Sequence, residues 1–108
     1  MIYEFLEKET KILKDELQEL ILRCEELEVK KQENKKFIQI LNESLDRKYA
    51  GFTPYEVTKD EDIKIQELRQ QVKNIEEELF ILKNRLPKLE NKVHEYEKMA
   101  EYAFKLEN

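Results

Sequence analysis

The sequence predicts an all-α protein, an elongated antiparallel hairpin of two long helices that pack as a coiled coil. Of its 108 residues one is glycine, two are proline and none is tryptophan, while 42% are charged and 40% hydrophobic. This composition is typical of long helices. Apolar residues recur at alternating spacings of three and four, which is the heptad pattern. The single glycine and one proline fall together near the middle, where the chain can reverse direction.

The first predicted helix spans residues 2–49. With Tyr3 as position a of the heptad abcdefg, the a row is Tyr3, Thr10, Leu17, Cys24, Lys31, Ile38 and Leu45. The d row is Leu6, Leu13, Leu20, Leu27, Asn34, Leu41 and Lys48. Leucine at five of these seven d positions indicates knobs-into-holes packing against a second helix.

Two polar residues, Lys31 and Asn34, interrupt this core in succession. Polar groups at core positions reduce stability but can specify register or partner number. One interpretation is a local loosening in which the lysine stems extend outward to water. The other is a hinge or acid-binding patch that responds to a signal, and the sequence leaves both open.

Residues 50–60 form the predicted connection. Gly51 suits the left-handed residue that ends a helix, and Thr53-Pro54-Tyr55-Glu56 and Thr58-Lys59-Asp60-Glu61 each fit a capping box. A short helical turn at 54–57 is therefore expected. Three aromatic side chains surround the connection, either as a plug against the helix ends or as an exposed patch for a partner protein: Tyr49, Phe52 and Tyr55.

The second predicted helix spans residues 61–107. Its a row is Ile65, Val72, Leu79, Leu86, Val93, Ala100 and Glu107, and its d row is Leu68, Ile75, Leu82, Leu89, Tyr96 and Ala103. The heptad keeps its phase across Pro87, so we expect one helix with a kink there rather than two helices. In an antiparallel pair, facing core residues have numbers with a constant sum. Sums near 113 and near 106 both match apolar residues, so the register stays open by one heptad.

Further apolar residues gather where the two chain ends are expected to meet. They are Ile2, Tyr3, Phe5, Leu6, Met99, Tyr102, Phe104 and Leu106. Either the two helices half-cover these groups, or a second copy covers them in a homodimer that places four helices at this end. We expect the homodimer.

Composition and motifs indicate no catalytic chemistry. The 20 basic and 25 acidic residues give a net charge of −5, which disfavours nucleic-acid binding. No apolar run could span a membrane, and no signal peptide is visible. The single Cys24 suits a reducing cytoplasm, and His94 beside Glu95 reads as a solvent-facing pair. We therefore expect a soluble cytoplasmic protein that is not an enzyme and has no cofactor or metal. Its expected partners are proteins, including a second copy of the chain.

The stretch Phe52-Thr53-Pro54-Tyr55, followed by a polar segment and an uninterrupted heptad helix, resembles a known group. It is similar to the N-terminal cytoplasmic coiled-coil sensory region of DegS-type sensor histidine kinases of Gram-positive bacteria. The resemblance implies a sensory or dimerisation segment of a cytoplasmic signalling protein. The kinase phospho-acceptor box and nucleotide-binding motifs are missing here, so no kinase activity carries over. The predicted function is a non-catalytic interaction or signal-input module, with a stand-alone structural or adaptor coiled coil as the alternative.

Overall fold

The computed structural model describes residues 1–48 and 59–108, with side chains described for 1–44 and 62–108. These segments form two helices, α1 (Ile2–Lys48) and α2 (Lys59–Glu107), and contain no strand. Helix α2 begins at Lys59, two residues before the predicted start. The aromatic residues predicted around the connection, Tyr49, Phe52 and Tyr55, lie outside the described residues.

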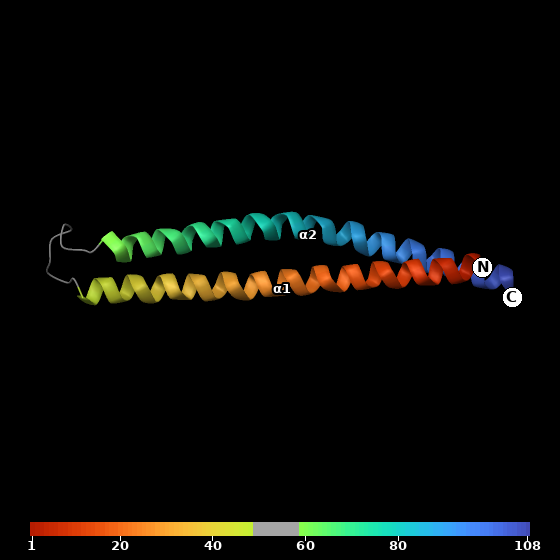
Figure 1. Ribbon diagram of the computed structural model, residues 1–108, viewed down its shortest axis with the longest axis horizontal. Helices are drawn as coiled ribbons and strands as arrows, with labels where there is room; N and C mark the ends of the chain where they lie inside the picture. Colours follow the sequence, from red (N-terminus) through yellow and green to blue (C-terminus); the bar gives the residue numbers. More distant parts are fainter. Residues whose placement is uncertain (49–58) are drawn as a thin grey trace. The chain divides into compact units, whose positions relative to one another are not determined.

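The two helices pack in two compact units. Unit 1 contains Met1–Glu25 and Phe80–Asn108, and unit 2 contains Glu26–Leu79. In each unit a segment of α1 lies antiparallel beside a segment of α2 (Figure 1). The predicted all-α antiparallel two-helix hairpin is therefore confirmed.

The predicted a and d positions form the core of both units. In unit 1 the buried members include Leu13, Leu20, Cys24, Val93, Ala100 and Ala103; in unit 2 they include Leu27, Ile65, Leu68, Val72, Ile75 and Leu79. Among the described side chains, every a and d residue is buried or half-buried except Glu107. A 3,4 spacing keeps one stripe of each helix facing its neighbour, which is why the heptad rows and the buried stripe coincide.

Thr10 is a buried polar residue within this stripe, with 7% of its surface exposed. Its hydroxyl donates a 2.7 Å hydrogen bond to the carbonyl of Leu6, one turn earlier in the same helix. A buried hydroxyl is costly only when it has no partner. The core therefore accepts this threonine without a polar contact from α2.

Helix α2 continues through Pro87, as the unbroken heptad phase predicted. Pro87 is exposed at a b position, outside the a and d stripe that packs against α1. A proline has no backbone N–H to donate to the carbonyl four residues earlier. At an exposed position, water can take the place of such a helical hydrogen bond. The kink expected at this residue stays a prediction.

Cross-helix contacts favour one of the two registers. The ring centroids of Tyr3 and Phe104 lie 5.1 Å apart in unit 1, and Lys31 Nζ lies 3.6 Å from Glu76 Oε1 in unit 2. The residue numbers of both pairs add to 107. Because helical side chains lean toward their own N-terminus, touching side chains have a slightly larger sum than residues at the same level. Both units therefore fit the register with a sum near 106.

Candidate interaction surfaces

An apolar groove lies on one side of unit 1, where the chain termini are. Its volume is about 510 Å³, and it is lined by Ile2, Leu6, Lys98, Met99, Tyr102, Ala103, Leu106 and Glu107. Heptad geometry explains this side: Ile2, Met99 and Leu106 occupy g positions, and Tyr102 occupies a c position, which neighbours g. We call Ile2, Phe5, Leu6, Met99, Tyr102, Ala103 and Leu106 the terminal surface.

Five of the seven terminal-surface side chains are exposed, whereas Leu6 is half-buried and Ala103 is buried. Ile2 is 66% exposed, Phe5 61%, Met99 44%, Tyr102 66% and Leu106 69%. Single exposed apolar residues are normal on a protein surface, but a contiguous patch flanked by charges is typical of an interaction site.

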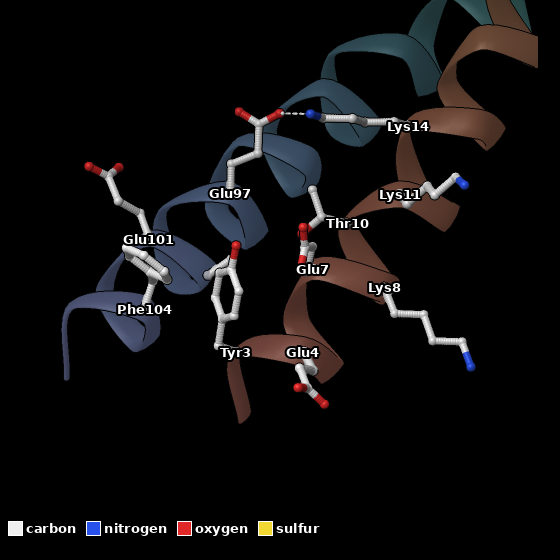
Figure 2. A pocket seen from close by; sticks show the side chains of 11 residues that line it. Tyr3, Glu4, Glu7, Lys8, Thr10, Lys11, Lys14, Glu97, Glu101 and Phe104 are labelled. Atoms are coloured by element: carbon white, nitrogen blue, oxygen red, sulfur yellow. Dashed lines mark ion pairs between the residues drawn. The ribbon is translucent and has the colours of Figure 1, made fainter. Parts of the chain in front are cut away.

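A second groove, of about 780 Å³, lies on the other side of the same helix pair (Figure 2). The rings of Tyr3 and Phe104 meet at one end of it, and Lys14 Nζ pairs with Glu97 Oε1 at 3.0 Å at the other. In Figure 2 the side chains of Lys8 and Lys11 point away from α2. The charged groups of this groove do not converge on one point, so its arrangement favours no particular ligand.

The eight terminal residues singled out from the sequence therefore fall into two groups. Six belong to the terminal surface, whereas Tyr3 and Phe104 pack against each other on the side of the second groove. Sequence reasoning missed Ile12, which is 44% exposed. It occupies position c of the heptad, two turns after Phe5, and the heptad assignment could have placed it on the same side.

Glu107 holds the first turn of α1 against the last turn of α2. Its Oε1 accepts hydrogen bonds from the backbone N–H groups of Ile2 at 3.1 Å and Tyr3 at 3.3 Å. It also lies 3.4 Å from the terminal ammonium of Met1. A carboxylate at a helix N-terminus accepts from amides that have no partner within the helix and faces the positive end of the helix dipole. The contact lies at the edge of the apolar groove, which Ile2 and Glu107 both line.

The polar interruption of the core lies in unit 2 and has partners on α2. Lys31 Nζ lies 3.6 Å from Glu76 Oε1, and Lys35 Nζ lies 3.8 Å from the same oxygen. Asn34 Nδ2 donates a 3.1 Å hydrogen bond to Gln71 Oε1. Lys31 and Asn34 are half-buried, so their polar ends reach the edge of the core. These contacts fit an outward-reaching lysine stem, and the hinge hypothesis stays a prediction.

The remaining candidates for chemistry stand apart from one another. His94 is exposed, and Cys24 is buried in the core as a free thiol. Among the described residues, no three or more His, Cys, Asp or Glu side chains come together as a metal site. Within the same segments, neither helix has a stretch that is both long and apolar enough to cross a membrane.

Comparisons of the chain with protein families, with curated proteins and with solved structures find no match.

Proposed function

We propose that this chain is a non-catalytic coiled-coil interaction module that self-associates through the terminal surface. The observation that carries the proposal is a shared apolar groove lined by the exposed residues Ile2, Met99, Tyr102 and Leu106. Phe5, which is also exposed, follows Ile2 by one turn on the same side of α1. A sensory or dimerisation segment of a cytoplasmic signalling protein is the setting that the resemblance at residues 52–55 favours.

The size of the terminal surface supports association of moderate strength. Burying a large apolar side chain stabilises a complex by about 1.5–3 kcal/mol when it is fully exposed beforehand. The five side chains are 44–69% exposed, so each contributes roughly 1–2 kcal/mol, or about 10–20 kcal/mol over two copies. Association costs about 4–15 kcal/mol in lost freedom. The difference is compatible with a dissociation constant near ~1 μM, which corresponds to about 8 kcal/mol.

Sedimentation equilibrium tests the proposal. At about 50 μM, well above a micromolar dissociation constant, the chain should sediment at twice its monomer mass of 13.2 kDa. Tyr102→Glu should raise the dissociation constant by at least ~100-fold, because each dimer loses two buried rings and gains two buried charges.

Phe80→Glu is the matched control. Phe80 is an aromatic residue of the same helix and unit with nearly the same exposure, 69% against 66% for Tyr102, but it occupies position b, away from the terminal surface. Its substitution should change the dissociation constant by less than about threefold, as expected for a surface position outside the contact. A monomer at this concentration, or equal effects of the two substitutions, contradicts the proposal. Circular dichroism of each variant checks that its helices are intact.

A further inference from the structure

On the side of unit 1 that carries the terminal surface, the charged residues of α1 and α2 are mostly of opposite sign. At the charged g and c positions next to the terminal surface, α1 carries mainly acids and α2 mainly bases. These are Glu9, Glu16 and Glu19 on α1, and Arg85, Lys88 and Lys92 on α2. All are exposed except the half-buried Glu9. Among the described residues of this side in unit 1, Arg23 on α1 and Glu95 on α2 are the exceptions.

We infer that the occupant of the terminal surface is a second copy of this chain, related by a twofold axis parallel to the helices. In this dimer α1 of each copy packs on α2 of its partner. The inference rests on the proposed self-association and adds its geometry. The contact is isologous, since the same patch of each copy is used.

Charge complementarity selects this axis over the alternative. Two such faces can also meet about a twofold axis that is perpendicular to the helices and runs between the two copies, parallel to the plane of each helix pair. That axis places α1 on the partner's α1. When the apolar residues of the two copies overlap about this axis, Glu16 and Glu19 extend beyond the contact and meet no bases of α2. The parallel axis places Glu16 and Glu19 level with Lys92 and Lys88 of the other copy. The exception is Arg23, which lies level with Arg85. Like-charge contact costs free energy, and opposite charges on facing surfaces specify orientation.

The register of unit 1 then specifies which residues meet. With a residue-number sum near 106, Glu19 of one copy lies level with Lys88 of the other, and Phe5 lies level with Tyr102. Both pairs occupy c positions, which face outward from the helix pair toward the second copy. At the first of these levels an acid therefore faces a base, and at the second an aromatic ring faces another.

Disulfide trapping of mixed single-cysteine variants tests the orientation. Glu19→Cys and Lys88→Cys are prepared separately and mixed in equal amounts under mild oxidation. The mixture should form a covalent dimer that contains one chain of each variant, and each variant alone should not. Cys24 is 7% exposed, so the unsubstituted chain serves as the blank. The control mixture, Gln18→Cys with His94→Cys, uses exposed b positions of the same unit on the opposite side and should remain uncrosslinked.

A charge test complements the trapping. Glu16→Lys with Glu19→Lys should weaken the dimer about tenfold at low salt. Adding Lys88→Glu and Lys92→Glu in the same chain should restore it, since the parallel axis then pairs the exchanged charges. A dimer in sedimentation that shows no mixed disulfide, or no weakening by the double lysine variant, overturns this orientation and leaves self-association standing. A monomer at about 50 μM overturns both.

Discussion

Replacing Lys31 by leucine measures what the polar interruption of the core costs this protein. Lys31 occupies an a position of α1, and its side chain is only 20% exposed. Its stem therefore already fills most of a core site, while its ammonium reaches Glu76 at the edge. A leucine side chain fills about the same volume as the lysine stem and carries no charge.

The expected change follows from two opposing contributions. Full burial of leucine contributes about 1.5–3 kcal/mol. The site buries four-fifths of its side chain, but the lysine stem already obtains part of this gain, which leaves roughly 1–2 kcal/mol. The ion pair that is lost spans 3.6 Å to a carboxylate that is 47% exposed, and such pairs contribute about 0–1 kcal/mol. We expect Lys31→Leu to raise the free energy of unfolding by about 1 kcal/mol, or the Tm by about 4 °C.

Thermal and urea unfolding, followed by circular dichroism at one protein concentration, measure this change. Lys35→Leu is the control, because Lys35 pairs with the same Glu76 oxygen but is 49% exposed outside the core. Its substitution should change the stability by less than about 0.5 kcal/mol. A loss of stability in Lys31→Leu would show that the charged contact outweighs apolar burial. Sedimentation of the variant must show an unchanged oligomeric state for the comparison to hold.

Two further substitutions test the core and the helix. Leu79→Ala should lower the free energy of unfolding by about 2–5 kcal/mol in urea unfolding, because Leu79 is 3% exposed, whereas Leu22→Ala, at 47% exposed, should lower it by less than about 1 kcal/mol. Equal losses would contradict the assigned core. Pro87→Ala should raise the Tm through a gain of about 1–3 kcal/mol, since alanine supplies the missing backbone donor at an exposed helical site; a lower Tm would show that the core depends on the backbone geometry that proline imposes.

The heptad pattern of the sequence determines most of this fold. Residues such as Leu27 and Leu79 return to the same angular position every seven residues, and that angle alone decides which side of a helix is buried. The same reasoning kept α2 in one piece across Pro87, because the apolar stripe continues in phase. The sequence did not locate the start of α2 to the residue, since two capping boxes compete within residues 53–61.

The tertiary structure decided the axial register, that is, how far one helix is shifted along the other. The heptad periodicity does not specify this shift. A shift by a whole heptad keeps the a and d residues of each helix facing the other helix, so the apolar pattern hardly distinguishes the sums of 106 and 113. Specific contacts distinguish them, such as Tyr3 with Phe104 and Lys31 with Glu76. The ring contact also separated Tyr3 and Phe104 from the terminal surface. A further cross-helix contact, the hydrogen bond to Gln71, showed where the amide of Asn34 is satisfied. The angle around each helix is thus written in the sequence, whereas the position along the axis depends on which side chains meet across the pair.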